Sequence, residues 1–268
     1  MPDQHFLTVA TLNILNDVST WQARGQLIVQ ELRTLAPDLI ALQEVALPAN
    51  NAQWIADQLS GYTVHLCPKT GSKSEHEALA ILSRLPAHDH ATLALVHQDR
   101  VAQCVTVEHG GQRLTFANVH LYFSLLNDSP RVAQVHRLLA WLPHDAPVIL
   151  CGDFNALPTR KSIQLMRARF VSAYATAHGH EPEFTFPSPL HRGPGLRHSA
   201  RSTLLKAIGL AQQRRNAPLR VTVDYIFVDP AIHVQECRIA FHRSDAQNER
   251  VYPSDHLGLM AKLELPHA

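Results

Sequence analysis

The segment Val148–Cys151 limits the fold of this chain most strongly, because it is an apolar run with no alternation of polar residues. Such a run is typical of a strand that is buried on both faces of a sheet. Gly152 and Asp153 follow it directly, and Pro158 rules out a longer strand. The sequence therefore predicts a core strand with a carboxylate at its end. That carboxylate either faces a ligand or only stabilises the turn.

Similar apolar runs alternate with helical patterns along the whole chain. Apolar residues recur at helical spacing in 21–36, 51–59 and 129–142. Paired glycines in HGGQ at 109–112 predict a hairpin between 101–108 and 113–120. Hairpins and crossovers together predict an α/β fold with mixed sheets covered by helices, in a single domain over residues 1–268. The other predicted strands are 6–14, 38–45, 62–67, 77–84, 90–96, 221–228 and 256–265.

Composition narrows the class of protein. A formal net charge of +1 gives no global attraction to polyanions. The four cysteines lie far apart without a C-x-x-C pair, so we expect buried free thiols in a reducing compartment. No basic leader with an apolar core opens the chain, and no apolar run approaches the length of about 18 residues that a membrane span needs. We expect a soluble, cytoplasmic protein without stable membrane association, and no protein partner is indicated.

Residues 184–223 differ from the rest of the chain, because they contain seven Arg or Lys residues and no Asp or Glu. One interpretation is a solvated loop with a short helix near Ser202–Gln213. The other is a basic insertion that faces an anionic substrate, with Arg192, Arg197 and Arg201 as candidate substrate-binding residues. The sequence leaves both interpretations open.

Polar side chains stand at or near the ends of six predicted strands, although the strands themselves are strongly apolar. If these ends share one edge of packed sheets, the side chains converge on a single ligand site. The residues are Asn13, Gln43 with Glu44, His120, Asp153 with Asn155, Asp224, and Asp255 with His256.

Six short motifs, TLNI, LQEV, NVHL, GDFN, DYIF and SDH, follow one another in this order from Thr11 onwards. In this order they resemble the endonuclease/exonuclease/phosphatase superfamily. The resemblance implies a four-layer sandwich, in which two mixed β-sheets pack face to face with helices on both outer sides. It also implies hydrolysis of a phosphate ester with Mg²⁺ or Mn²⁺.

The resemblance also implies a role for each motif. Glu44 resembles the main metal-binding carboxylate, with Asn13 and Asp255 as further ligands, and hard oxygen ligands suit Mg²⁺. His256 resembles the residue that activates the attacking water, held in one tautomer by Asp224.

The remaining motifs provide groups for the phosphate. Asp153 and Asn155 would orient the nucleophile and donate to a phosphoryl oxygen. His120 would bind phosphate or assist the leaving group, paired with Glu77. The implied reaction is an in-line attack on phosphorus.

The motifs define the substrate less well than the reaction. Asn13–Asn16 lacks the N-x-D-G pattern of the abasic-site endonucleases, and Leu257 stands where that branch has proline. We expect a phosphodiester in a nucleic acid or nucleotide. The alternatives are a phosphatase or phospholipase acting on inositol phosphates or sphingomyelin-type lipids, and a protein that only binds a phosphorylated ligand. A zinc enzyme is not indicated, since the histidines lack ligand spacing.

Overall fold

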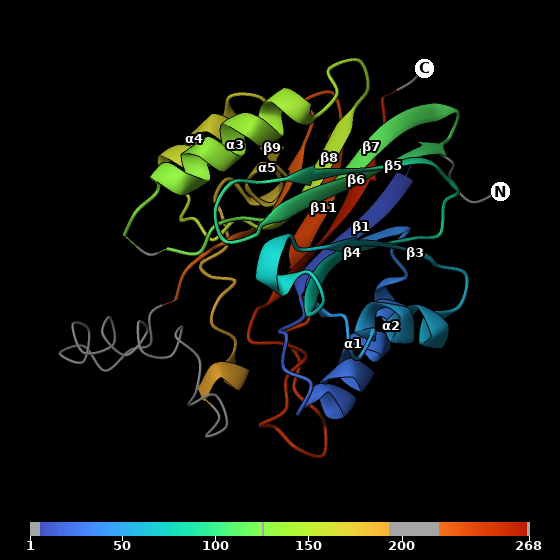
Figure 1. Ribbon diagram of the computed structural model, residues 1–268. Coiled ribbons are helices and arrows are strands. Elements are labelled where there is room, and N and C mark those ends of the chain that lie inside the picture. The colour runs from blue at the N-terminus through green and yellow to red at the C-terminus, as the bar shows by residue number, and fades with distance from the viewer. Residues whose placement is uncertain (1–5, 125, 193–219, 267–268) are drawn as a thin grey trace.

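Two mixed β-sheets of six strands each form the centre of the fold (Figure 1). The computed structural model describes residues 6–124, 126–192 and 220–266. The first sheet has the strand order β11 (His233–Ala240), β12 (Gly258–Glu264), β1 (Phe6–Asn13), β2 (Leu39–Ala46), β4 (Glu77–Ser83) and β3 (Thr63–Pro68). The second has the order β5 (Ala87–Ala94), β6 (Val101–His109), β7 (Gln112–His120), β8 (Val148–Asp153), β10 (Asp224–Val228) and β9 (Val171–Ser172).

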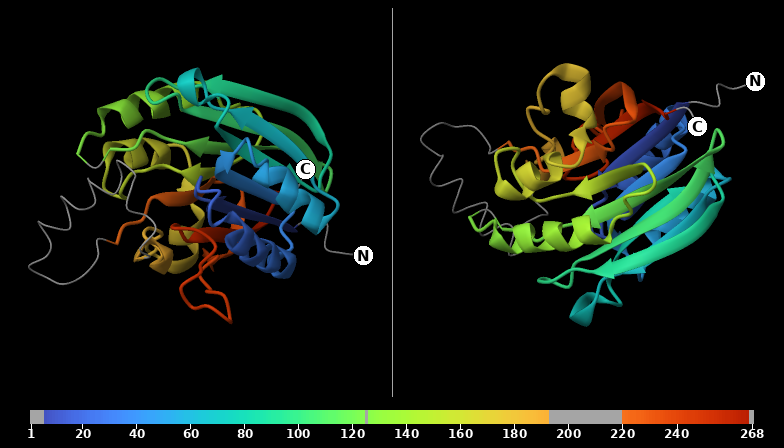
Figure 2. Two further views of the ribbon diagram at one scale, coloured as in Figure 1. Left: turned by 60° about the horizontal axis from the view of Figure 1, so that its bottom comes forward. Right: turned by 90° about the horizontal axis from the view of Figure 1, so that it is seen from above.

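The sheets pack face to face, and helices cover their outer faces (Figure 2). Val9 and Ile81 of the first sheet lie in one apolar cluster with Phe116 and Ile226 of the second. The helices α1 (Trp21–Leu35) and α2 (Asn51–Leu59) pack on the first sheet, and α3 (Ser129–Trp141) and α4 (Lys161–Arg167) pack on the second. The predicted four-layer sandwich is therefore confirmed. The short elements are α5 (Ala173–His178) and the 3₁₀ helices η1 (Gly71–Lys73) and η2 (Pro189–Arg192).

Strand register brings the polar strand ends to one edge. β7 and β8 are parallel with His120 opposite Asp153, and β10 runs antiparallel to β8 with Asp224 opposite Asp153. These three residues therefore form one row across the second sheet. In the first sheet β12 is antiparallel to β1, so the residues before β12 lie beyond Asn13 at the same edge.

Three predicted positions need correction. Glu44 lies within β2 rather than at its end, because the pairing with β4 shifts at a bulge between Leu42 and Val45 and then continues to Ala46. Asp224 is the first residue of β10, since residues 221–223 precede the strand. Asp255 and His256 precede β12, which begins at Gly258. The sequence reading also missed α4, α5 and β11, and the helix predicted near Ser202–Gln213 lies outside the described residues.

A group of buried amides joins the two sheets directly beneath the polar edge. Gln43 Nε2 donates to Asn118 Oδ1 at 2.8 Å and to Thr11 Oγ1 at 3.1 Å. Asn118 Nδ2, from the second sheet, donates at 2.9 Å to the carbonyl oxygens of Leu42 and Ala80 in the first sheet. Buried amides are stable only when they are hydrogen-bonded, so these bonds favour one relative position of the sheets.

Two expectations from composition can be compared with the structure. All four cysteines are buried and unpaired, as expected for free thiols within the core. Among the helices of the described ranges, none combines the length and the apolar character that crossing a bilayer requires.

Candidate active site

A β-bulge in β2 directs Glu44 toward the polar edge. The pairing of β2 with β4 shifts between Leu42 and Val45, and Glu44 has a φ of 60°. A left-handed backbone at a residue other than glycine costs on the order of 1 kcal/mol or more, and such residues cluster at functional sites. The Glu44 carboxylate accepts hydrogen bonds from Asn13 Nδ2 at 3.2 Å and from the backbone N–H of Asn16 at 3.2 Å.

Gly152 allows β8 to approach β7 closely enough to place Asp153 at the centre of the site. Its φ is 148°, and a Cβ atom at this position would lie 2.0 Å from the carbonyl oxygen of Val119. Only glycine fits there. Asp153 is fully buried, and its Oδ2 accepts a hydrogen bond from Asn13 Nδ2 at 3.1 Å. The same oxygen lies 3.3 Å from Nε2 of His120 and 4.0 Å from Nε2 of His256.

His256 and Asp224 form a buried pair. His256 Nδ1 lies 2.9 Å from Asp224 Oδ2 and 3.2 Å from Oδ1. Burial lowers the pKa of His256, but the charge and hydrogen bond of Asp224 outweigh it and raise the pKa to about 10. Burial raises the pKa of Asp224 to about 6, against the opposing effect of His256. The imidazole is therefore protonated at neutral pH and directs its Nε2 toward Asp153.

His120 has a different environment. Arg100 Nη1 lies 2.7 Å from His120 Nδ1. A guanidinium only donates, so Nδ1 is the acceptor and the ring proton lies on Nε2. Burial, reinforced by the charge of Arg100, lowers the pKa of His120 to about 4. The imidazole is therefore neutral at neutral pH, with its N–H facing Asp153.

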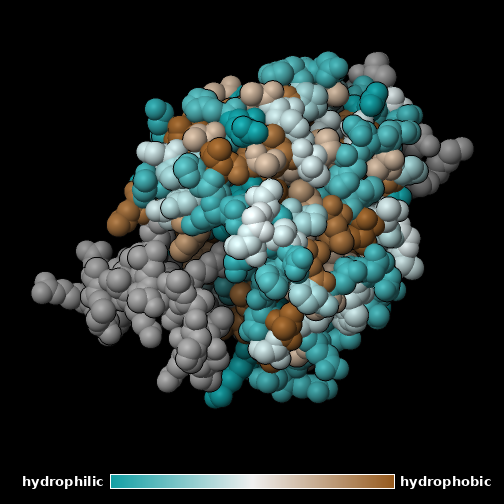
Figure 3. All heavy atoms as spheres, in the orientation of Figure 1, coloured by the Kyte–Doolittle hydropathy of each residue, from teal (hydrophilic) through white to brown (hydrophobic). Residues whose placement is uncertain are grey.

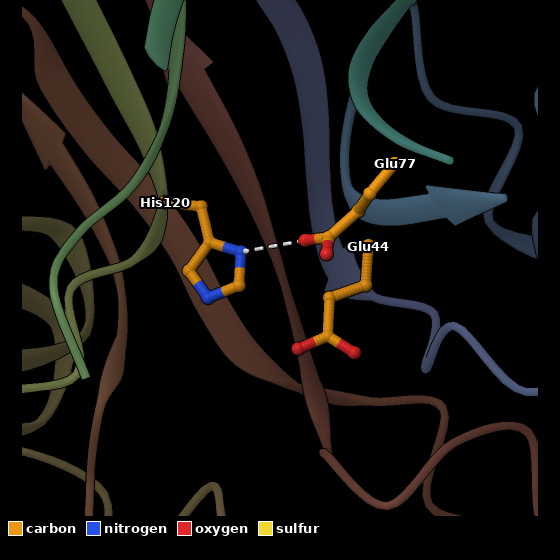
Figure 4. Close-up of side chains that lie close together, drawn as sticks. All are labelled: Glu44, Glu77 and His120. Atoms are coloured by element: carbon orange, nitrogen blue, oxygen red, sulfur yellow. Dashed lines mark ion pairs between the residues drawn. The ribbon is translucent and has the colours of Figure 1, made fainter. Parts of the chain in front are cut away.

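The Glu77 carboxylate lies close to His120 but binds other groups. Its Oε1 is 3.9 Å from His120 Nδ1, the contact drawn in Figure 4. The same oxygen lies 2.5 Å from Lys69 Nζ and 3.8 Å from Arg100 Nη1. Arg100 thus occupies the imidazole nitrogen that the expected Glu77–His120 pair would use, and Lys69 is the nearer partner of Glu77.

Within the part of the chain that the structure describes, two groups of side chains could hold a metal ion. One is Glu44 with Glu77 and His120, and the other is Asp153 with Asp224 and His256; within each, the ligand atoms lie within 4.8 Å of one another. The first group offers two carboxylates, and hard oxygen donors of this kind suit Mg²⁺ or Mn²⁺. Glu44 and Glu77 therefore fit the ion that the family resemblance implies, whereas His120 Nδ1 is already in contact with Arg100.

The other two expected ligands occupy different places. Asn13 donates from Nδ2 to both Glu44 and Asp153, so its amide nitrogen faces these carboxylates, and its Oδ1 accepts from the backbone N–H of Leu15. Asp255 is buried and belongs to neither of the two groups found among the described residues. Its Oδ1 lies 3.4 Å from Ser254 Oγ.

Asn155 ties the loop after β8 to the end of β7. Its side-chain Nδ2 donates to the carbonyl oxygen of Leu121 at 3.1 Å, and its backbone N–H donates to Asp153 Oδ1 at 2.9 Å. Asn155 adopts a φ of 49°, a conformation that asparagine tolerates better than most residues. It therefore fixes the Asp153 carboxylate.

The sequence reading missed Arg24, whose guanidinium is fully buried behind the site. Burial lowers its pKa, while Asp255, Asp17 and Glu44 act in the opposite direction. The residue lies on the buried stripe of α1 with Trp21 and Ile28, so helical periodicity could have identified it. It joins the loop after β1 to the segment before Asp255 by donating to four carbonyl oxygens, those of Ile14, Leu15, Asp17 and Pro253, at 2.7 to 3.1 Å.

Lys69 and Arg100 were also missed. Lys69 directly follows β3 and Arg100 directly precedes β6, and both are almost fully buried. Neither position carries a periodic signal. In the sequence each residue is a single basic residue next to a strand, as many surface residues are. Only the folded structure therefore shows that both residues are buried at the site.

The two ends of the basic segment border the site. Phe186 pairs with Val221 in a β-bridge, and the Phe186 ring centroid lies 4.8 Å from that of His256. The backbone N–H of Ser188 donates to the carbonyl oxygen of Asp255 at 2.7 Å. Arg192 is the last residue of η2. Arg197 and Arg201 lie outside the described residues, so their proposed contact with substrate stays a prediction.

Comparison with known proteins identifies the same family over almost the whole chain. The sequence model described as "Endonuclease/Exonuclease/phosphatase family" matches residues 10–256. Protein angel of Drosophila melanogaster is 28% identical over 199 residues, which cover 67% of this chain and 54% of that protein. Nocturnin of Homo sapiens is 26% identical over 273 residues, which cover 90% of this chain and 57% of that protein. The match thus spans little more than half the length of these curated relatives.

A solved structure shares the fold. The crystal structure of D. rerio TDP2 complexed with single strand DNA product has a TM-score of 0.75 to this chain. The alignment covers 97% of this chain and 99% of the other, with 17% sequence identity. At this identity the likeness shows the fold alone.

Proposed function

Because this chain belongs to the Endonuclease/Exonuclease/phosphatase family, whose members hydrolyse phosphoester bonds, we propose that it is a metal-dependent phosphodiesterase acting on a nucleic acid or nucleotide. The observation that carries the proposal is the row His120, Asp153 and Asp224, completed by His256. In this row a neutral imidazole and a second, carboxylate-bound imidazole both direct Nε2 toward the Asp153 carboxylate at the edge of the sheets.

Each side chain has a distinct task in the proposed reaction. Asp153 Oδ2 orients a water molecule for in-line attack on phosphorus, with Asn155 holding this carboxylate in place. His256 accepts the proton of the water at Nε2 after losing its own, while Asp224 stabilises the resulting imidazolium. His120 donates from Nε2–H to a phosphoryl or leaving oxygen.

The acidic edge would hold the cation. We assign Mg²⁺ or Mn²⁺ to Glu44 and Glu77, which belong to one of the two candidate groups, whereas the other expected ligands, Asn13 and Asp255, lie outside that group. When bound, this ion supplies positive charge to a phosphoryl oxygen. Asn13 positions Glu44 and Asp153 relative to each other, since its amide donates to both.

Two observations favour nucleic acid or a nucleotide over a lipid. Hydrophilic residues cover most of the face in Figure 3, and apolar side chains form separate small groups among them. A protein of the same fold, D. rerio TDP2, forms a complex with a single strand DNA product. Phosphodiesters of this class therefore come first in the test.

A substrate panel tests the proposal. Bis-p-nitrophenyl phosphate, single- and double-stranded nucleic acids, inositol phosphates and sphingomyelin would be assayed with Mg²⁺, with Mn²⁺ and after chelation. We expect hydrolysis of nucleic acid or nucleotide diesters, lost with chelator and in Glu44→Gln. Glu75→Gln, which changes an exposed carboxylate close to Glu77, is the matched control and should retain activity. Phosphate binding without turnover would support a binding protein instead, and full activity after chelation would refute the metal requirement.

A further inference from the structure

Arg24 lies in the first turn of α1, where a cation is unfavourable for the helix itself. The partial positive charge at the start of a helix repels a guanidinium, and burial adds the cost of its lost solvation. Arg24 is nonetheless fully buried. The helix alone therefore does not explain an arginine at this position, and its contacts have to be considered.

The guanidinium of Arg24 has five N–H groups and five acceptors. Nε donates to Thr20 Oγ1 at 2.9 Å. Nη1 and Nη2 each donate to two carbonyl oxygens, those of Ile14 (2.7 Å) and Pro253 (3.0 Å), and those of Leu15 (3.1 Å) and Asp17 (2.7 Å). A lysine has three donors and no planar fork, so it could not make this set of bonds.

The bonds to the loop after β1 fix two backbone N–H groups of the site. Leu15, whose carbonyl oxygen Arg24 binds, has a φ of 58°, a left-handed conformation that leucine rarely adopts. The N–H of Leu15 donates to Asn13 Oδ1 at 3.1 Å, and that of Asn16 donates to Glu44 Oε2 at 3.2 Å. Because Oδ1 of Asn13 is held in this way, its Nδ2 faces the carboxylates of the site.

The bond to Pro253 fixes the opposite side of the site. Ser254 follows directly, and its Oγ donates to the carbonyl oxygen of Asn13 at 2.5 Å. The same Oγ accepts the backbone N–H of His256 at 3.2 Å. Arg24 Nη1 thus joins the loop that orients Asn13 to the segment that carries His256. These two segments, blue and red in Figure 1, lie side by side.

We infer that Arg24 is a positioning residue of the active site. Through the backbone of residues 14–17 and 253–254, it sets the place of the Asn13 amide and of the His256 imidazole relative to each other. It acts by the geometry of its five donors and not by its charge alone. The inference rests on the proposed function for its effect on turnover, whereas its effect on the two side chains can be measured without a substrate.

Arg24→Lys tests the inference, because it keeps the charge and removes the fork of donors. With bis-p-nitrophenyl phosphate, kcat should fall about tenfold or more with little change in KM, since the catalytic groups are displaced and no contact with the substrate is removed. NMR spectra of the unliganded protein should show shifted signals for the Asn13 side-chain amide and for the Nδ1–H of His256. Arg169→Lys is the matched control. Arg169 also donates to carbonyl oxygens, at the end of α3, so its replacement should change neither kcat nor the two signals.

Thr20→Val tests the same link if Arg24→Lys does not fold. It removes the acceptor of Arg24 Nε, besides a long contact of 3.4 Å with Asp17 Oδ2. Thr20 is exposed and its side chain does not cap α1, so the helix should form as before. The same two NMR signals should shift and kcat should fall. Thr34→Val changes an exposed threonine at the other end of α1 and should leave the signals and kcat as they are.

The outcomes separate this inference from the proposed function. If the wild type hydrolyses no ester but the two signals move in a folded Arg24 or Thr20 variant, the positioning role stands and the hydrolytic function falls. If the folded variants leave both signals in place, Arg24 only stabilises the fold and the inference is overturned. Shifted signals with an unchanged kcat, in an enzyme that is active as the wild type, would overturn it as well.

Discussion

Arg100 Nη1 lies 2.7 Å from Nδ1 of His120, and this contact determines which ring nitrogen carries the proton. His256 is arranged the other way round, since its Nδ1–H donates to Asp224. Both imidazoles direct Nε2 toward Oδ2 of Asp153. His120 therefore offers a hydrogen-bond donor on the side of Asp153 as a neutral ring, and His256 can act as a base only after it loses its Nε2 proton.

The Arg100 contact can be tested by spectroscopy. Nitrogen NMR at neutral pH should find His120 of the wild type as the neutral Nε2–H tautomer. Arg100→Met should release this preference and lower kcat by about tenfold or more, because the donor to the phosphoryl oxygen is no longer fixed. Arg113→Met changes an exposed arginine of β7 and should alter neither result. An unchanged tautomer in Arg100→Met would show that Arg100 does not control it.

The lowered pKa of His120 makes stability depend on pH. The imidazole titrates near pH 6.5 when the chain is unfolded and near pH 4 in the fold. Between these values the unfolded state binds more protons, so the free energy of unfolding falls as the pH drops from 6.5 to 4. The loss amounts to about 3 kcal/mol at most.

Urea unfolding of the wild type and of His120→Gln at several pH values measures this effect. The wild type should lose stability more steeply than His120→Gln below pH 6.5, since the variant lacks the titrating group. His88→Gln removes an exposed imidazole and should follow the wild-type slope. Parallel slopes for all three proteins would contradict a buried, neutral His120.

Asp224→Asn distinguishes the effect of the Asp224 charge on His256 from the effect of its hydrogen bond on the position of the imidazole. The variant keeps a hydrogen-bonding side chain but removes the charge that holds the pKa of His256 near 10. We expect kcat to fall by about a hundredfold or more. Any limb of the pH–rate profile due to His256 should also move to lower pH, because the imidazole then loses its proton more readily. Asp57→Asn, on the exposed side of α2, is the control, and a limb that stays in place would argue against His256 as the base.

Gly152→Ala tests the close approach of β8 to β7. A Cβ atom would collide with the Val119 carbonyl oxygen at 2.0 Å. That oxygen belongs to the backbone of the neighbouring strand, which cannot move aside easily. We expect a loss of about 3 kcal/mol or more in the free energy of unfolding. Gly179→Ala is the matched control, since Gly179 has a φ of 77° but open space around its Cβ position. It should lose only about 1 kcal/mol. Equal losses would show that backbone conformation, and not the approach of the strands, decides the cost.

The sequence predicted the sheets well, because their strands are apolar and turns such as that at 109–112 are marked by glycine residues. The register of β6 against β7 follows from the paired glycines of the hairpin, and the three longest helices carry clear apolar stripes. By contrast, α4 and α5 span seven and six residues, too few for a period to be recognised. β11 alternates irregularly between buried and exposed residues and was missed for that reason.

The site was predictable in its residue types but not in its pairings. Strand order brings Asp153, Asp224 and His256 together, because β8 ends at the edge of the sheets where β10 and β12 begin. Which side chain pairs with Glu77 depends on the positions of single residues in the loops beside the strands. Lys69 and Arg100 occupy those places, so Lys69 is the nearer partner of Glu77 and Arg100 is the partner of His120 Nδ1.

The amides of Gln43 and Asn118 connect the two halves of the sandwich within its interior. If one sheet separated from the other, these groups would lose their partners while still surrounded by apolar side chains. A half-unfolded chain would therefore carry the cost of unsatisfied polar groups, without the solvation that complete unfolding provides. The two sheets should consequently unfold together, in a single cooperative transition, and the site that both of them build should be present in full or absent.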